Sequence, residues 1–425
     1  MAKTYDTYKD SGIAWIGEIP GEWEVKRLGN FYNQRNEKVS DKDFAPLSVT
    51  MKGIVPQLET AAKTNDGDNR KLVRKGDFAI NSRSDRRGSC GISDYDGSVS
   101  LINTVLCPKG EMDAGYYNWL FHTSMFADEY YKWGHGIVDD LWTTRWSEMK
   151  NIEVVNPPLS VQQSISSFLD TKCSEIDSLI SIQEEMISEL LAYKQSVITE
   201  AVTKGLDKKA KMKNSGVEWI GDIPEEWEVI KIQYLNQGLT DGTHGTYNRV
   251  DKGRLLLSSK NVREKDLLIT DSESQISEED YQSIISNGFP KKGDLLMCCI
   301  GASIGRCIIY KYDETYAFQR SVIFIRCNKL IKPELLRYNL LSNNSLLQEL
   351  FLINQSAQAG LYQGQVKEIK VIVPPISKQK QIIDYLDKKT SQIDSLIALK
   401  LSKIESLKEY KKSIIYEYVT GKKRV

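Results

Sequence analysis

The sequence contains little that would support a metal site or a disulfide framework. Only three histidines occur (His122, His135 and His244), and they are not spaced as metal ligands. The seven cysteines form an odd-numbered set with no C-x-x-C pair. Secreted disulfide-rich domains and structural zinc sites both need paired cysteines, so we expect reduced, mostly buried thiols and no bound metal.

Long hydrophobic runs are also missing. No apolar stretch approaches the roughly 18 residues that a membrane helix needs, and the first residues, MAKTYDTYKDSG, lack the features of a signal peptide. The sequence therefore predicts a cytoplasmic protein with no membrane partner.

The chain has no excess of charge and no nucleotide-binding loop. Lys plus Arg and Asp plus Glu each number 57, so any nucleic-acid surface must come from local clustering. No G-x-x-x-x-G-K-[ST] loop occurs. The NPPL stretch at residues 156–159 resembles the N-P-P-[YF] motif of amino-methyltransferases, but Leu159 replaces the aromatic residue and the second copy has Val373 in place of Asn. We expect no cofactor and no catalytic site.

What the sequence does contain is a long internal repeat. SGIAWIGEIPGEWEV at residues 11–25 returns as SGVEWIGDIPEEWEV at residues 215–229, which is 204 residues later. K-G-D at residues 75–77 and P-P-x-x-x-Q at residues 157–162 both return after 217 residues. The change of offset places about 13 extra residues early in the second copy. The chain is therefore expected to consist of two halves built on one plan.

Each half is predicted to end in a long helix, over residues 161–203 and 378–420. A Pro-Pro step precedes each helix, and Ser160 and Ser377 are the predicted N-caps. At 1.5 Å per residue each helix would be about 65 Å long, which favours a coiled coil over an ordinary core helix. The first helix is predicted to carry two stripes of residues at heptad spacing. One runs through Ile176, Leu190 and Val197, and the other through Leu179, Met186 and Tyr193.

Basic residues cluster in both variable regions. Residues 67–91 hold seven Lys or Arg against three Asp, and residues 241–265 hold six against three acids. A solvated face is the ordinary explanation of such runs. Contacts to DNA phosphates and base edges are the functional one. The candidate DNA-binding residues are Arg70, Lys71, Arg74, Arg83, Arg86, Arg87, Thr243, His244, Tyr247, Asn248, Arg249, Lys252, Arg254, Lys260 and Arg263.

One loop within the second cluster is the best single candidate for contact with a DNA groove. Residues 240–249, TDGTHGTYNR, look like a glycine-hinged loop that carries Thr, His, Tyr, Asn and Arg side chains. A plain surface hairpin is the alternative.

The duplicated layout resembles the specificity subunit of type I restriction–modification systems. W-I-G-x-I-P-x-x-W, K-G-D, P-P-x-x-x-Q and I-D-x-L-I occur twice, in that order, over nearly the whole chain. The resemblance implies an α+β fold of two globular mixed α/β target recognition domains joined by two long antiparallel coiled-coil helices, with pseudo-two-fold symmetry. The expected boundaries are residues 1–155 and 207–372 for the domains, and residues 156–206 and 373–425 for the helices.

The same resemblance implies a non-catalytic DNA-binding subunit. It would read a bipartite site in double-stranded DNA and direct adenine methylation and cleavage by partners. These partners would be modification subunits, two by expectation, and restriction subunits that join through the assembled complex. Two alternatives stay open from the sequence: a methyltransferase or nuclease on a duplicated scaffold with its own catalytic site, and a coiled-coil scaffold that binds no nucleic acid.

Overall fold

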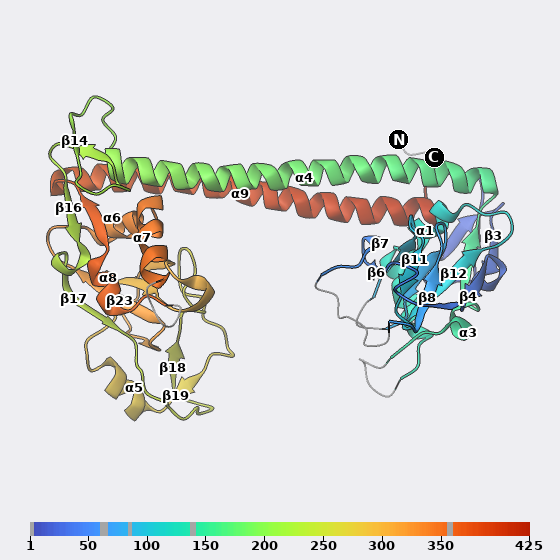
Figure 1. Ribbon diagram of the computed structural model, residues 1–425, viewed down its shortest axis with the longest axis horizontal. Coiled ribbons are helices and arrows are strands. Elements are labelled where there is room, and N and C mark those ends of the chain that lie inside the picture. The colour runs from blue at the N-terminus through green and yellow to red at the C-terminus, as the bar shows by residue number, and fades with distance from the viewer. Residues whose placement is uncertain (1–3, 60–66, 84–86, 137–141, 355–359) are drawn as a thin grey trace. The chain divides into compact units, whose positions relative to one another are not determined.

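The chain folds into two compact units that share two long helices (Figure 1). The computed structural model describes residues 4–59, 67–83, 87–136, 142–354 and 360–425. Unit 1 consists of Met1–Gln183 and Leu401–Val425, and unit 2 is Glu184–Lys400. The division therefore cuts both long helices at positions 217 residues apart, the offset of the sequence repeat.

The described residues of unit 1 form short strands and short helices besides its parts of the long helices. The strands are β1 (Tyr8–Asp10), β2 (Glu18–Pro20), β3 (Glu24–Arg27), β4 (Tyr32–Arg35), β5 (Lys38–Val39), β6 (Leu47–Thr50), β7 (Gly53–Pro56), β8 (Arg70–Val73), β9 (Phe78–Asn81), β10 (Cys90–Ile92), β11 (Gly97–Val99), β12 (Asn103–Pro108) and β13 (Glu153–Asn156). The helices are α1 (Ala114–Phe121), α2 (Ser124–Lys132) and α3 (Trp146–Met149).

Unit 2 repeats this mixture. Its strands are β14 (Met212–Asn214), β15 (Asp222–Pro224), β16 (Glu228–Lys231), β17 (Asn236–Asp241), β18 (Arg254–Leu257), β19 (Gln275–Ile276), β20 (Leu295–Cys298), β21 (Cys307–Ile309), β22 (Ala317–Phe318), β23 (Val322–Cys327) and β24 (Lys370–Val373). Its short helices are α5 (Glu278–Ile285), α6 (Pro333–Leu340), α7 (Asn343–Asn354) and α8 (Gln363–Glu368).

The two units share the topology of their central sheet. The central antiparallel sheet has the order β10-β9-β12-β4 in unit 1, and unit 2 has the matching order β21-β20-β23-β17. The pairs β1-β2 and β3-β13 likewise match β14-β15 and β16-β24. The predicted α+β class with two mixed α/β domains is confirmed, and the repeat seen in the sequence is a repeat of structure.

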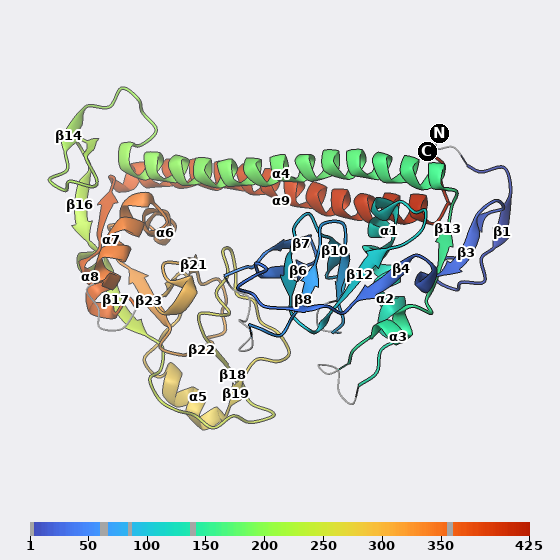
Figure 2. The same ribbon diagram turned by 45° about the vertical axis from the view of Figure 1, so that its right-hand side comes forward.

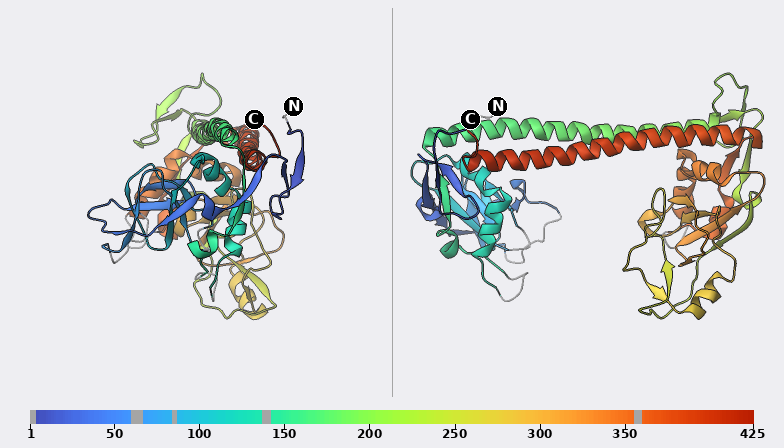
Figure 3. Two further views of the ribbon diagram at one scale, coloured as in Figure 1. Left: turned by 90° about the vertical axis from the view of Figure 1, so that its right-hand side faces the viewer. Right: turned by 180° about the vertical axis from the view of Figure 1, so that it is seen from behind.

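The long helices are α4 (Leu159–Lys204) and α9 (Ile376–Val419). Each unit contains the beginning of one helix and the end of the other, so the two helices run antiparallel within it (Figure 3). Lys411 Nζ lies 2.6 Å from Asp177 in unit 1, and Lys194 Nζ lies 2.6 Å from Asp394 in unit 2. The two predicted long antiparallel helices are confirmed. Within the described residues, no helix combines the length and apolar character needed to cross a membrane.

The N-cap prediction was wrong, because both serines lie inside the first helical turn. The helices begin at Leu159 and Ile376, one residue earlier than Ser160 and Ser377. The carbonyl of Pro158 already accepts the amide of Val161 at 2.8 Å. The second proline of each Pro-Pro step therefore holds the N-cap position.

The glutamine of the P-P-x-x-x-Q motif ties each long helix to the unit that precedes it. Gln162 is 2% exposed; its Nε2 donates to the carbonyl of Pro157 at 2.8 Å, and its Oε1 accepts the amide of Asp113 at 2.9 Å. Asp113 caps α1, so this side chain fastens α1 to α4. Gln379 makes the equivalent pair of bonds between α6 and α9. Burial makes these bonds costly to lose, since each orphaned polar group would cost about 1–3 kcal/mol.

The register of the coiled-coil seam differs in part from the prediction. The stripe through Ile176 and Val197 is confirmed, but Leu179, Met186 and Tyr193 are 47%, 38% and 53% exposed. The seam instead follows alternating steps of three and four residues along buried or half-buried side chains. These are Cys173, Ile176, Ile180, Gln183, Ile187, Leu190, Lys194, Val197 and Ala201.

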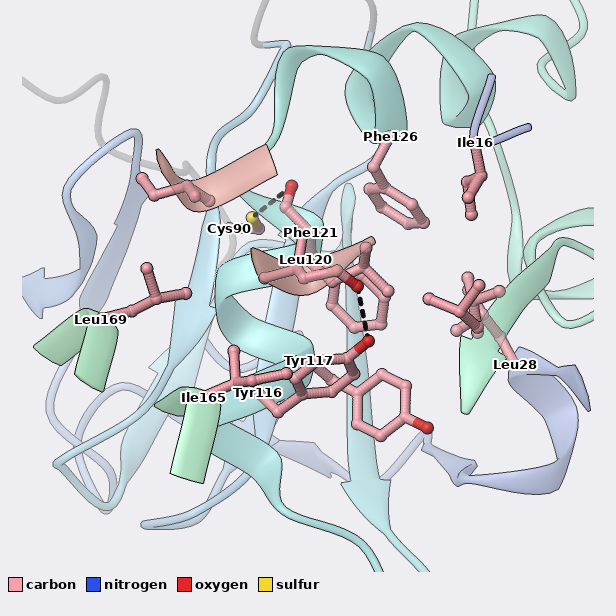
Figure 4. Close-up of a cluster of buried hydrophobic side chains, with 14 of the residues drawn as sticks. Ile16, Leu28, Cys90, Tyr116, Tyr117, Leu120, Phe121, Phe126, Ile165 and Leu169 are labelled. Atoms are coloured by element: carbon pink, nitrogen blue, oxygen red, sulfur yellow. Dashed lines mark hydrogen bonds between the residues drawn. The ribbon is translucent and has the colours of Figure 1, made fainter. Parts of the chain in front are cut away.

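The core of unit 1 is built between its sheet and both long helices. Figure 4 shows Tyr116, Tyr117, Leu120 and Phe121 of α1 near Ile165 and Leu169 of α4. The same cluster continues to the last turns of α9 through the side chains Ile414, Ile415 and Val419. Unit 2 is assembled in the opposite sense, from the end of α4 and the beginning of α9: Val197, Ile198, Ile382, Ile383 and Leu386.

The tryptophan motif closes each unit against the end of a long helix. Trp23 is fully buried and packs on Gly421, which follows α9 with φ +75°; a Cβ there would lie 3.0 Å from the indole ring. Trp227 packs in the same way on Gly205, which follows α4. Glycine is needed at both positions because each has a positive φ and leaves no room for a Cβ. The motif of one half is therefore completed by the helix of the other half.

The aspartate of the K-G-D motif holds a buried ion pair in each unit. Asp77 is 3% exposed and accepts from Arg35 Nε at 2.7 Å and from the amide of Arg74 at 2.8 Å. Asp294 is 2% exposed and accepts from Arg326 Nε at 2.8 Å. Arg35 comes from β4 and Arg326 from β23, so the two units supply the arginine from different strands. The motif is structural.

Replacing Asp294 by alanine is expected to lower the free energy of unfolding by about 3 kcal/mol, because the half-buried Arg326 guanidinium would lose its buried partner. Urea unfolding of the purified chain measures the shift. The matched control is Asp96→Ala, which removes an exposed pair with Arg74, whose side chains are 51% and 45% exposed. An exposed pair contributes at most about 1 kcal/mol. Equal effects of the two substitutions would contradict the structural role.

Candidate nucleic-acid interface

Unit 1 carries a surface hollow of about 610 Å³ whose charged lining residues are all cations. Lys71, Arg83, Arg145 and Lys150 line it, and the described part of the lining contains no carboxylate. Its lining residues come from β4, β8, β12, α3 and the segments beside them, and these elements are labelled in Figure 2. We call this surface the unit 1 hollow. A concave surface lined by one sign of charge concentrates a polyanion.

Three segments position these cations. Arg83 follows β9 and forms an isolated antiparallel bridge with Thr143. Arg145 lies two residues after Thr143 and immediately before α3. Lys71 belongs to β8; its Nζ donates to the carbonyl of Asn103 at 2.7 Å, and burial lowers its pKa. Neither Arg83 nor Arg145 forms an ion pair within the residues described, so both guanidinium groups can contact an anion.

The rim of the hollow also offers apolar and hydroxyl groups. Leu101 and Ile102 are 39% and 37% exposed, and Trp146 is half-buried. The carboxamide of Gln34 and hydroxyl side chains such as that of Thr104 complete the lining. Proteins that read a DNA groove use cations to contact phosphates, and polar and apolar groups to contact base edges. The unit 1 hollow offers both kinds of group.

Of the described residues in the first predicted cluster, only Lys71 and Arg83 line the unit 1 hollow. Arg70 is 4% exposed, its Nε donates to Ser98 Oγ at 2.8 Å, and burial lowers its pKa. A side chain bonded in this way inside the unit is explained by its structural role, and we leave it out of the proposed contact set.

The remaining cations of the first cluster are partly neutralised. Arg74 pairs with Asp96 at 2.9 Å. Arg87 pairs with Asp128 at 3.0 Å and lies over the ring of Tyr131. Arg86 lies outside the described residues.

The second cluster divides in the same way. Arg254 pairs with Glu278 at 2.8 Å and Glu314 at 3.1 Å, and Lys260 pairs with Glu273 at 2.9 Å. Four further candidates are exposed and have no ion pair within the described chain: Asn248, Arg249, Lys252 and Arg263.

The loop at residues 240–249 is held more firmly than a hinge. Gly242 has no positive φ; a Cβ there would lie 2.3 Å from the carbonyl oxygens of Phe318 and Gln319, so glycine permits a close approach. Thr243 then pairs in parallel with Gln319, and its hydroxyl lies 2.6 Å from the Tyr247 hydroxyl. The segment that follows β17 therefore lies beside β22, and whether this loop contacts DNA stays a prediction.

The surface of unit 2 that corresponds to the unit 1 hollow carries different side chains. Its isolated bridge joins Ile300 to Gly360, and these residues follow Arg83 and Thr143 by 217 positions. Tyr362 and Gln363 stand where unit 1 has Arg145 and Trp146. His244 and Gln363 both lie within hydrogen-bonding distance of the Asp241 carboxylate. The two units thus share a frame and differ in the groups they present.

Three polar residues of these surfaces were not among the predicted DNA-binding residues: Arg145, Lys150 and Gln363. Each is an isolated polar residue in a short stretch without a charge run, so composition carried no signal. The offset of 217 that relates the two bridges would have identified the corresponding positions once one of them was known.

The described chain holds no group of three or more His, Cys, Asp or Glu side chains that could bind a metal ion. All seven cysteines are free; burial raises the pKa of Cys90 and Cys307 to about 12, which suppresses the nucleophilic thiolate.

Comparison with known proteins gives consistent similarities. Residues 222–407 match the type I restriction modification DNA specificity domain. The type I restriction enzyme MjaVIII specificity subunit of Methanocaldococcus jannaschii is 26% identical over 96% of this chain and 94% of its own length. The putative type I restriction enzyme MjaX specificity subunit of the same organism is 23% identical over 96% of each chain.

A solved structure shares the fold. A chain from a study of complex assembly and conformational transition of the type I R-M system superposes with a TM-score of 0.71 at 14% identity, covering 94% of this chain and 98% of that one. The duplicated motifs, the matched domain and these relatives make the chain similar, over most of its length, to type I restriction enzyme specificity subunits.

Proposed function

We propose that this chain reads a bipartite site in double-stranded DNA, each unit contacting one half-site, and directs the chemistry of partner subunits. One observation carries the proposal: equivalent surfaces on one repeated frame present different side chains. Arg83, Arg145 and Trp146 of unit 1 correspond to Ile300, Tyr362 and Gln363 of unit 2. A repeated scaffold with divergent surfaces is what recognition of two unlike half-sites requires.

The DNA contacts divide by chemistry. The unpaired cations of the unit 1 hollow fit phosphates, since they stay charged and each neutralised phosphate releases counterions. In unit 2 the exposed Arg249, Lys252 and Arg263 have the same role. Thr243, Tyr247 and Asn248 add hydrogen-bonding groups to this surface. Arg254 and Lys260 are weaker candidates for phosphate contacts, because carboxylates already neutralise them.

The exposed apolar stripe on the long helices supports docking of two copies of one partner, which we take to be the modification subunit. In each unit, two aliphatic side chains of one helix and a tyrosine of the other are exposed at positions that correspond by the 217-residue repeat. They are Leu179, Ile182 and Tyr410 in unit 1, and Leu396, Leu399 and Tyr193 in unit 2. Exposed apolar patches of this kind mark interaction sites.

We propose that adenine methylation comes from these partners, and cleavage from restriction subunits that join the complex, so that the chain itself catalyses neither. We assign residues 1–155 and 207–372 to DNA recognition, and residues 156–206 and 373–425 to the helical spacer. A subunit that reads genomic DNA acts in the cytoplasm of its host.

The decisive experiment assays DNA methylation with S-adenosylmethionine by the chain alone, by the modification subunit alone and by their mixture. We expect turnover only in the mixture, at adenines of a motif with two read parts and an unread spacer. Sequencing of the methylated adenines identifies that motif.

Two results would reject the proposal. Methylation or cleavage by the chain alone would show an autonomous enzyme on a duplicated scaffold. Absence of salt-dependent duplex binding by the mixture would show a scaffold without nucleic-acid function.

A further inference from the structure

We infer that Gln363 is a base-reading side chain of unit 2, that Asp241 is its positioning residue, and that the base read is the adenine of an A·T pair. This rests on the proposed DNA-reading function and names one contact within it. The residues come from two segments far apart in sequence, the end of β17 and the first turn of α8.

Three side chains form a connected polar cluster at this surface. Gln363 Nε2 donates to Asp241 Oδ1 at 2.6 Å, and His244 Nε2 lies 2.9 Å from Asp241 Oδ2. The Asp241 side chain is 17% exposed, while that of His244 is 63% exposed. One carboxylate therefore orients two outward groups with its two oxygens. We call this set the polar cluster.

The backbone beneath the polar cluster is fixed. The amide of Gly242 donates to Val322, and the amide of Thr243 donates to Phe318 at 2.8 Å. The close approach at Gly242 leaves no space for the segment to shift toward the sheet. On the other side, the amide of Tyr362 donates to Gln365 Oε1 at 2.9 Å at the start of α8. A reading group needs such support, because small displacements weaken a bidentate contact.

The free groups of Gln363 match an adenine. Its Nε2 carries two hydrogens, of which Asp241 takes one; the second hydrogen and Oε1 stay available for a partner. A glutamine that donates to N7 and accepts from the N6 amino group recognises adenine in the major groove. The bond to Asp241 also fixes which end of the amide donates, since a flipped amide would place its oxygen against a carboxylate.

The charge around the polar cluster favours base edges over the DNA backbone. Asp241 has no Lys or Arg partner within the described chain, and a carboxylate near phosphates would repel them. The neighbouring Arg320 is exposed, and its amide donates to the carbonyl of Thr243 at 3.0 Å. Its guanidinium is the group placed to meet the backbone beside the base that Gln363 reads.

The test uses the complete complex with modification subunits and compares DNA methylation by wild type, Gln363→Ala and Asp241→Ala. Relative rates are measured on duplexes that differ at one base pair at a time in the half-site assigned to unit 2. We expect one A·T position at which the wild type discriminates about tenfold or more and both variants lose that discrimination. The other half-site should be read as before.

Gln363→Glu combined with Asp241→Asn is a sharper variant, because the new amide at position 241 can donate to the new carboxylate, which Asp241 itself would repel. A carboxylate can only accept, so preference at that position should move from adenine toward cytosine, whose N4 amino group donates. The matched control is Gln282→Ala, which removes another unit 2 glutamine that donates to a carboxylate, Glu278, at 2.7 Å. The control should leave the methylated motif unchanged.

The outcomes separate this inference from the proposed function. If wild type and Gln363 variants methylate the same bipartite motif with the same base preferences, the proposed function stands and Gln363 is only a structural link between β17 and α8. Uniform loss of activity at every site, with a lowered unfolding transition, would overturn the inference in the same way. A wild-type complex that binds no duplex would reject the proposed function itself.

Discussion

Replacing Arg83 and Arg145 together by glutamate is expected to weaken DNA binding by the complex with modification subunits about a hundredfold. The two guanidinium groups line the unit 1 hollow and have no ion pair within the described chain. Loss of one phosphate contact, with repulsion added, costs about a factor of ten at each site, or about 1.4 kcal/mol. Titration of a duplex at several salt concentrations measures both the affinity and its salt dependence.

The salt dependence separates a direct contact from an indirect effect. Each lost phosphate contact lowers the slope of log K against log salt by about one, so the double variant should lose about two. The matched control is Lys42→Glu with Lys132→Glu, which changes the same charge at exposed positions of unit 1 outside the hollow. Equal losses in the two double variants would show a general effect of net charge and refute the hollow as a contact surface.

Inserting one residue after Gln183 and one after Lys400 is expected to abolish assembly with modification subunits. Both insertions fall where the contact pattern divides the chain. One extra residue rotates everything beyond it by about 100°, so the seam that includes Ile187 and Leu190 would turn away from its partner helix. Size-exclusion chromatography of the chain mixed with modification subunits measures the loss.

A four-residue insertion at the same two places should have the opposite outcome. Four residues add about 6 Å and slightly more than one turn, so the seam keeps its face. If the helices set the distance between the half-sites, both half-site sequences should persist while the unread spacer grows by one or two base pairs, each about 3.4 Å. Sequencing of methylated adenines decides this. An unchanged spacer with full activity would mean that the helices do not set the distance.

The frame of the molecule was predictable because its signals are periodic or duplicated. The Pro-Pro steps and long heptad patterns located every end of α4 and α9 to within two residues. Periodicity could not choose between Leu179 and Ile180, or between Met186 and Ile187, because both members of each pair are apolar. Only the packing in the structure shows that the later residue of each pair enters the seam.

The candidate interface was less predictable, because a charged residue in a sequence can be exposed, buried or ion-paired in the fold. Arg70 looked like a DNA contact but is bonded to Ser98 inside unit 1. Arg254 looked equally suitable and is satisfied by two carboxylates that lie 24 and 60 residues away. Conversely, Arg145 and Gln363 reach their surfaces only because distant strands bring them there. Neighbours set by tertiary pairing leave no mark in local composition.

The way in which the tryptophan motifs are closed has a consequence for the order of folding during synthesis. Unit 2 is one continuous stretch, so the ribosome delivers all of Glu184–Lys400 before the last helix is finished. Unit 1 starts earlier but needs Leu401–Val425, where Gly421 receives Trp23. Domains usually fold as they emerge, N-terminal ones first. Unit 1 is translated first, but we expect Trp23 to stay uncovered until the final turns of α9 are translated. During synthesis the N-terminal part of the chain is therefore expected to be the part most accessible to chaperones and proteases.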